Sequence, residues 1–168
     1  MKLRWYLLIF FVALLAYACR KPDEYPLVPV IIFKNIYTTI NSQGYDEKMT
    51  VLLNFTDGDG DVGYKDPGQN GLPYDDPTSK YYDNYIAKLF QFKNGAWVEY
   101  PTISPLGGRI PYLTPIGKNK ALNGEIACDI DVPPKSENDT FRLDIFIYDR
   151  TLQQSNTVTT SEVVLNTK

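Results

Sequence analysis

The sequence contains no histidine among its 168 residues. Histidine is the side chain that most often acts as a general base and as a ligand of transition metals. Its absence excludes Ser-His-Asp and Cys-His nucleophilic catalysis, although nucleophiles activated by lysine stay open. The chain is therefore predicted not to be an enzyme of the common hydrolase types.

Helical periodicity and an excess of basic charge are also missing. No window beyond residue 20 repeats its apolar residues every 3.6 positions, so we expect almost no helix. Without Lys2 and Arg4, which lie in a segment that we expect to be removed, 15 basic residues face 20 acidic ones. Seven acidic residues and two lysines fall between residues 57 and 83. Because phosphate binding needs clustered positive charge, we expect no nucleic-acid partner.

The first 18 residues have the pattern of a signal peptide. A short basic start, residues 1–4, precedes an uncharged apolar run over residues 5–18. That run is shorter than the roughly 20 residues that a membrane-spanning helix needs, so export and cleavage are predicted, with an uncleaved anchor as the alternative.

The segment Leu15-Ala16-Tyr17-Ala18-Cys19 resembles the lipobox of bacterial lipoproteins. Ala18 fits the small residue expected before the cysteine, whereas Ala16 and Tyr17 depart from the usual pattern. The resemblance implies lipid attachment at Cys19, a tether over residues 19–28 and anchoring in the outer membrane. Acidic residues in 20–24 resemble an export signal to the cell surface, and an ordinary polar tether is the alternative. Several buried acyl chains would anchor the protein stably.

Only one further cysteine is present. If Cys19 carries lipid, Cys128 has no partner and no intramolecular disulfide can form. Cys128 lies on the apolar side of the alternating segment 125–132, so we expect a small buried core residue of low reactivity.

Within the mature chain, residues 29–168 show the pattern of an all-β domain. Strands are predicted at residues 30–37, 49–55, 85–92, 96–100, 109–113, 125–132, 141–149 and 157–165. About seven strands with frequent turn residues favour an antiparallel Greek-key β-sandwich of immunoglobulin-like class, and a small barrel is the alternative. Residues 57–84 form a connection far longer than usual, and its tyrosines argue against disorder.

The long loop begins with Asp57-Gly58-Asp59-Gly60-Asp61. Glycine allows the chain to curl, so the three carboxylates could meet around a hard cation such as Ca²⁺. Solvated aspartates in ordinary turn chemistry are the alternative. The spacing matches the first ligands of an EF-hand loop, but Val62 and Gly68 replace its required glycine and glutamate, so this is not an EF-hand.

Two motifs carry a wider resemblance. The segments 55–63 and 147–158, together with the lipobox-like start, look like a group of uncharacterised Gram-negative lipoproteins with an Asp-Gly-Asp-Gly-Asp motif and a C-terminal Asp-Arg hairpin. The resemblance implies a fold and a location but no activity. Asp149 of the hairpin is a candidate fourth metal ligand, or equally a turn residue that caps its own backbone.

Three functions follow as hypotheses. The first is a non-catalytic, lipid-anchored envelope protein that binds or scaffolds an envelope partner through the 57–84 loop, ordered by calcium. The second is carbohydrate binding, and the third is a small glycosidase that uses paired carboxylates between Asp57 and Asp83. The aromatic residues considered as ligand contacts are Tyr74, Tyr81, Tyr82, Tyr85 and Trp97.

Overall fold

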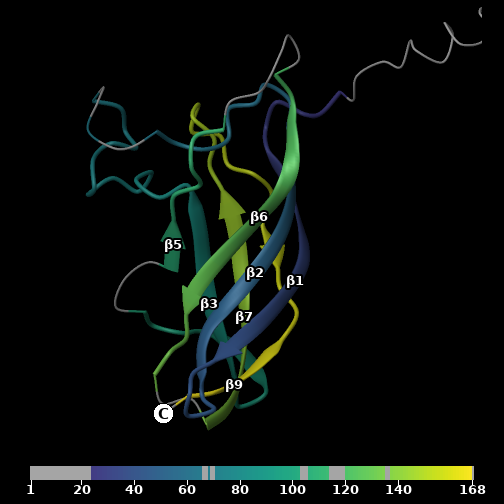
Figure 1. The fold of residues 1–168 in the computed structure, drawn as a ribbon, viewed down its shortest axis with the longest axis vertical. Helices are drawn as coiled ribbons and strands as arrows, with labels where there is room; N and C mark the ends of the chain where they lie inside the picture. The colour runs from purple at the N-terminus through teal and green to yellow at the C-terminus, as the bar shows by residue number, and fades with distance from the viewer. Residues whose placement is uncertain are drawn as a thin grey trace, which may run out of the picture.

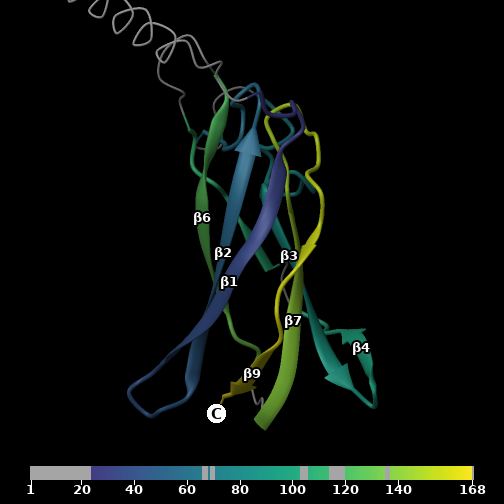
Figure 2. The same cartoon turned by 90° about the vertical axis from the view of Figure 1, so that its right-hand side faces the viewer.

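The computed structural model describes residues 24–65, 68, 71–102, 106–113, 120–134 and 137–167. Across these residues the regular structure is entirely β, in two antiparallel sheets that form a sandwich (Figures 1 and 2). The all-β prediction is therefore confirmed. The predicted signal peptide and Cys19 lie outside the described residues. No helix in the described part of the chain is long and apolar enough to cross a bilayer.

The first sheet has three strands in the order β1-β2-β6. They are β1 (Val30–Ile40), β2 (Asp46–Asp57) and β6 (Leu122–Asp131). The second sheet has the order β4-β3-β7-β8, with β5 also paired to β3 and β9 also paired to β7. Its strands are β3 (Tyr85–Lys93), β4 (Ala96–Glu99), β5 (Leu106–Gly108), β7 (Glu137–Ile147), β8 (Val158–Thr159) and β9 (Val163–Asn166).

The core lies between the sheets and follows the alternation of the sequence. The inward residues of β2 and β7 are at most 5% exposed: Met49, Val51, Leu53, Phe55, Phe141, Leu143, Ile145 and Ile147. Their neighbours in the sequence point mostly to the outer faces, because side chains alternate along a strand. The alternation of apolar residues along both strands therefore marks the face that is buried.

Two predicted strands need correction. The short strand expected at residues 109–113 lies instead at Leu106–Gly108, where β5 pairs with β3. Arg109 leaves the sheet because its guanidinium donates to backbone carbonyls of the long loop. The last predicted strand divides into β8 and β9, since the side chain of Thr160 accepts the Leu143 N–H that a continuous ladder would use.

Cys128 packs against the core but is only half-buried. Burial raises the pKa of its thiol to about 12. A thiol that stays protonated at neutral pH is a poor nucleophile, which agrees with the low reactivity expected from the sequence.

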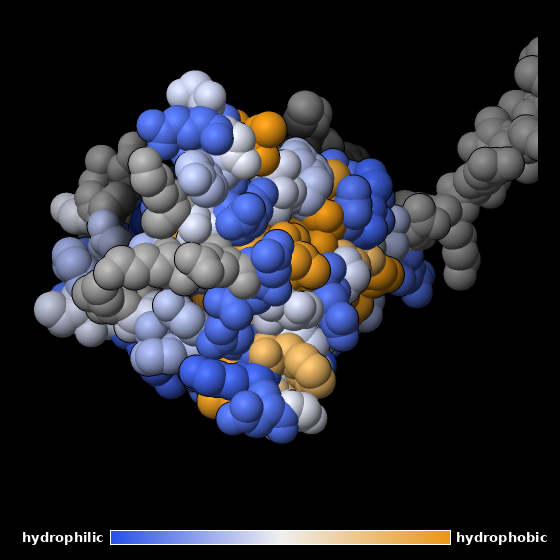
Figure 3. All heavy atoms as spheres, turned by 90° about the horizontal axis from the view of Figure 1, so that it is seen from below, coloured by the Kyte–Doolittle hydropathy of each residue, from blue (hydrophilic) through white to orange (hydrophobic). Residues whose placement is uncertain are grey.

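The two ends of the sandwich differ in content. One end carries the β3–β4 hairpin, β9 and the β1–β2 hairpin (Figure 2). Seen from that end, apolar surface is interspersed among hydrophilic surface (Figure 3). The other end carries the long loop after β2, the turn after β7 and the N-terminal segment that enters β1 (Figure 1).

A matched pair of leucines tests this core. Replacing Leu143, which is fully buried, by alanine should lower the free energy of unfolding by about 2 to 5 kcal/mol, through lost burial and a residual cavity. The same change at Leu27, which is 62% exposed, should cost no more than about 0.5 kcal/mol. Urea denaturation of both variants makes the comparison, and equal losses would contradict the placement of the core.

Candidate metal centre

The loop that follows β2 is curled by the carboxylate at the end of that strand. Asp57 Oδ2 accepts hydrogen bonds from the backbone N–H of Asp61 at 2.7 Å and of Val62 at 2.9 Å. Gly60 has a φ of 71°, which residues with a Cβ rarely adopt. The chain therefore turns back on itself within four residues, so Asp59 and Asp61 are brought toward Asp57.

The curl brings three carboxylates together. One oxygen from each of Asp57, Asp59 and Asp61 lies within 4.8 Å of the others. Asp57 is fully buried and Asp61 is 9% exposed. A solvated turn of aspartates would leave these groups in water, so their burial argues against the simpler explanation from turn chemistry.

Asp149 approaches the cluster from the second sheet. It follows β7, is fully buried and pairs through its backbone with Val62 in an antiparallel bridge. Its Oδ1 accepts hydrogen bonds from Thr151 Oγ1 at 2.9 Å and from the Gln153 N–H at 2.8 Å. Asp149 thus caps its own turn with Oδ1, while its Oδ2 is buried without a hydrogen-bond partner. The three carboxylates that lie within 4.8 Å of one another do not include Asp149.

Four carboxylate oxygens at this site are buried and accept no hydrogen bond. They are Asp57 Oδ1, Asp59 Oδ1, Asp61 Oδ1 and Asp149 Oδ2. Buried polar atoms in native proteins almost always have a partner, and an unpaired buried charge is especially costly. Four such oxygens on neighbouring carboxylates indicate a site for a cation that carboxylate oxygens could coordinate.

The charge of Arg150 lowers the pKa of Asp61, against the effect of burial, but Arg150 forms no ion pair with the described carboxylates. Arg150 donates from its guanidinium to the carbonyl oxygens of Gly60 and Gly63 at 3.0 Å and of Val62 at 3.3 Å. Its backbone N–H donates to the Asp61 carbonyl at 3.2 Å. Arg150 therefore holds the loop in shape, while the carboxylates remain without an ion-pair partner among the described residues.

The unneutralised charge is reflected in the acidity of the site. Burial raises the pKa of Asp57 to about 6, against the hydrogen bonds from Val62 and Asp61 that lower it. Burial, followed by the charge of Asp149, raises the pKa of Asp61 to about 7. Burial also raises the pKa of Asp149. Without a bound cation, protons must take up part of the negative charge near neutral pH.

The donor set suits a hard divalent cation. The cluster of Asp57, Asp59 and Asp61 could hold a metal ion such as Ca²⁺. Calcium and magnesium prefer carboxylate, carbonyl and water oxygens, whereas zinc and copper favour nitrogen and sulfur ligands that this cluster lacks.

The aromatic residues predicted as ligand contacts lie in different places. Tyr74 and Tyr85 are 8% and 2% exposed, so neither ring offers a face for stacking on the outer surface of the protein. Tyr81 contacts the ring of Tyr148 edge to face, with ring centroids 5.0 Å apart. The Tyr82 ring lies against the guanidinium of Arg109. Trp97, on β4, packs under the guanidinium of Arg142, on β7.

Arg109 organises the long loop, a role that no local sequence pattern indicated. It donates to the carbonyls of Tyr74, Tyr82 and Lys65, which lie 35, 27 and 44 residues away. The Tyr74 ring stacks on Tyr64 with ring centroids 4.2 Å apart. These contacts tie described residues of the long loop to one another and to Arg109.

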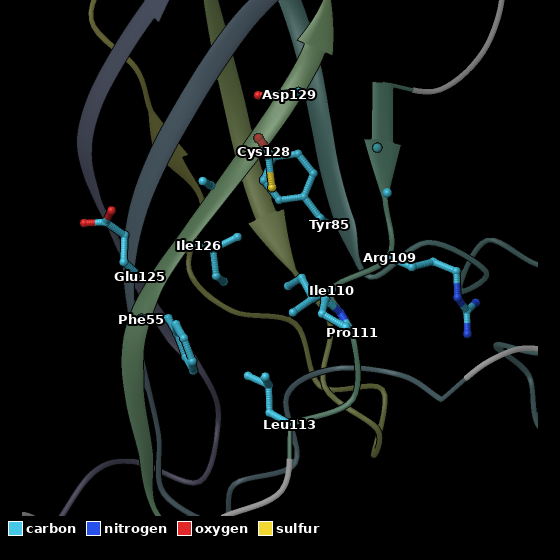
Figure 4. Close-up of a pocket in the computed structure, with 13 residues that line it drawn as sticks. Phe55, Tyr85, Arg109, Ile110, Pro111, Leu113, Glu125, Ile126, Cys128 and Asp129 are labelled. Atoms are coloured by element: carbon cyan, nitrogen blue, oxygen red, sulfur yellow. The ribbon is translucent and has the colours of Figure 1, made fainter.

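A cavity of about 360 Å³ lies beside β6 and is separate from the aspartate cluster. The Tyr85 ring and Cys128 lie close together on one side of it, and Ile110, Pro111 and Leu113 lie on another (Figure 4). The Glu125 side chain points away from the cavity (Figure 4). None of the four aspartates of the site lines it.

Comparisons with protein-family models, with curated proteins and with solved structures each find no match. The resemblance to Gram-negative lipoproteins therefore stays a prediction from short motifs. Inference about function rests on the side-chain geometry described above.

The raised pKa values predict how the stability of the metal-free protein depends on pH. The unfolded chain loses these protons near the ordinary value of 3.8, whereas folded Asp57 and Asp61 hold them to about pH 6 and 7. Their contribution to stability is therefore full below about pH 4, decreases as the pH rises toward 7 and is constant above it.

Asp61→Asn isolates this effect, because it removes the charge and keeps the shape. In EGTA, the variant should melt close to the wild type at pH 4 and about 5 °C or more above it at pH 8. Differential scanning calorimetry at several pH values measures the difference. If the variant melts below the wild type at pH 8, ionisation of the cluster does not destabilise the metal-free protein, and this interpretation is wrong.

Proposed function

We propose that this chain is a non-catalytic binding or scaffolding module, ordered by one calcium ion and held to the outer membrane through lipid on Cys19. The observation that carries the proposal is the set of four buried carboxylate oxygens with no partner. The lipobox-like sequence supports the anchor, and the long loop that begins at the site supplies the contact surface.

Calcium fits the site better than magnesium does. Calcium accepts six to eight oxygen ligands in flexible geometry, whereas magnesium demands a near-octahedral shell and keeps several waters. The free oxygens of Asp57, Asp59, Asp61 and Asp149 are supplied by two segments from different sheets. The proposal assigns these oxygens to the ion and leaves the remaining positions to water or backbone carbonyls.

The same geometry supports a non-catalytic role. Glycosidases place two carboxyl groups about 5 to 9 Å apart on either side of a substrate cleft. Here the oxygens of three aspartates lie within 4.8 Å of one another, and Asp57 is fully buried. Such a cluster is suited to holding an ion rather than to protonating a substrate.

We also assign the sandwich to the immunoglobulin-like class. Chain order alternates between the sheets: β1 and β2 lie in one, β3 and β4 in the other, β6 returns to the first, and β7 to β9 return to the second. This crossing pattern supports a Greek-key topology. In that class, loops at the two ends of the sandwich commonly bind partners.

Asp59→Asn tests the metal. With calcium at 100 times its dissociation constant, binding should stabilise the wild-type protein by about 2.7 kcal/mol, which raises Tm by roughly 5 to 10 °C over EGTA. The variant should lose most of this increase, because Asp59 Oδ1 faces the cluster without another partner. Thermal unfolding of both proteins with and without calcium provides the measurement.

Asp131→Asn is the matched control, since Asp131 is exposed on β6 and should leave the calcium effect intact. Asp149→Asn should behave like Asp59→Asn if Asp149 Oδ2 is a ligand. Identical melting of the wild-type protein in calcium, magnesium and EGTA would remove the metal from the proposal.

Carbohydrate binding is a second candidate, because two groups of contacting aromatic side chains lie on or beside the six-stranded sheet. Tyr148 contacts both Tyr81 and Phe146 edge to face. Phe92 packs on Trp97, with ring centroids 5.2 Å apart. These rings are half-buried or exposed, as stacking on sugar rings requires.

Trp97→Ala tests this candidate in affinity electrophoresis with soluble glucans, mannans and xylans. The variant should bind a polysaccharide that retains the wild-type protein about tenfold more weakly, because Trp97 is the largest of these rings. Tyr85→Phe, a change inside the core, should retain wild-type binding. No retention of the wild-type protein by any polysaccharide would reject the candidate.

A further inference from the structure

The segment that enters the domain lies directly on the metal loop. The Gly58 N–H donates to the Pro26 carbonyl oxygen at 2.8 Å. One residue earlier, the Tyr25 hydroxyl accepts a hydrogen bond from Asn123 Nδ2 at 2.8 Å. Residues 24–29, which we call the docked segment, therefore contact both the loop after β2 and the neighbouring strand β6.

Gly58 permits this contact because it has no side chain. A Cβ at this position would lie 2.3 Å from the Tyr25 carbonyl oxygen and 2.7 Å from the Pro26 carbonyl oxygen. Real Cβ atoms do not approach backbone oxygens so closely, so any larger residue must displace the docked segment. Gly58 stands between Asp57 and Asp59, two of the proposed ligands, and the backbone that positions them also holds the segment.

A second contact secures the chain just downstream. The side-chain amide of Asn156 accepts from the Ile31 N–H at 2.8 Å and donates to the Ile31 carbonyl at 2.9 Å. Asn156 lies beyond the turn that Asp149 begins. The entering chain is thus held by elements from both sides of the metal centre, and only the upstream contact involves the metal loop itself.

We propose that the metal centre is a latch for the membrane tether, an inference that rests on the proposed calcium site. With the ion bound, the loop is fixed and the docked segment lies on Gly58. Without the ion, repulsion among four carboxylates loosens the loop, and the docked segment separates as far as the start of β1, where Val30 pairs with Thr56. Six released residues add about 20 Å to the tether, so calcium sets how far the domain reaches from the membrane.

Chymotrypsin reports the state of the latch. Its target is the bond after Leu27, whose side chain is 62% exposed and whose backbone lies in the docked segment. Proteases need locally unfolded chain, so the cleavage rate follows the opening of the segment. In the full lipidated chain reconstituted in phosphatidylcholine vesicles, cleavage after Leu27 should be at least about tenfold faster in EGTA than in calcium.

A pair of glycine variants separates the latch from the metal. At saturating calcium, Gly58→Ala should still cleave rapidly, because its Cβ displaces the segment. Titration calorimetry should show that it binds calcium with reduced affinity, because docking and calcium binding favour each other reciprocally. Gly108→Ala is the control, since a Cβ there has open space and no unusual φ. Asn123→Ala, which removes the bond to the Tyr25 hydroxyl away from the loop, should also accelerate cleavage.

The experiments distinguish failure of the latch from failure of the metal site. Calcium binding by calorimetry with equal cleavage rates in calcium and EGTA would overturn the latch and leave the metal site standing. Absence of calcium binding would overturn the proposed function, and the latch with it. Fragments from cuts within β7 in EGTA would show that the whole domain opens rather than the segment alone, which would also overturn the latch.

Discussion

Repulsion among buried carboxylates is the constraint on which this end of the molecule depends. Asp57, Asp61 and Asp149 are almost completely withdrawn from water, yet the nearby guanidinium of Arg150 is directed at backbone carbonyls. Like charges at this separation in a partly desolvated site repel strongly. The folded state must therefore bind protons or a cation there, and the raised pKa values and the unpartnered oxygens are two consequences of that same requirement.

The constraint acts between the sheets rather than within one of them. Asp57 ends β2 of the three-stranded sheet, whereas Asp149 follows β7 of the six-stranded sheet. The bridge between Val62 and Asp149 and the Tyr64 hydroxyl bond to the Asp149 carbonyl connect the two segments. An ion held by both would join the sheets where the core ends, so its contribution to stability and its ordering of the loop would arise together.

Alternation along β2 and β7 was enough to predict the sandwich, because each strand buries one face and the hydrophobic period shows it. The acidic cluster was also readable, since glycines between aspartates indicate a bend that gathers them. The role of Arg109 was not, because its partners are backbone carbonyls 27 to 44 residues away, which leave no trace in local sequence. The burial of Tyr74 depends on that same long-range contact and was equally hidden.

The turn after β7 shows why Asp149 could not be assigned to one role from sequence. A carboxylate has two oxygens, and here Oδ1 caps the turn through Thr151 and Gln153 while Oδ2 remains free. Leu152 within that turn has a φ of 66°, a conformation that is costly for a residue with a Cβ. Capping offsets that cost, whereas the burial of Oδ2 without a partner adds a further cost in desolvation. A turn that needed only a cap could leave its carboxylate in water, so the buried and unpartnered Oδ2 is consistent with the proposed role of Asp149 as a fourth ligand.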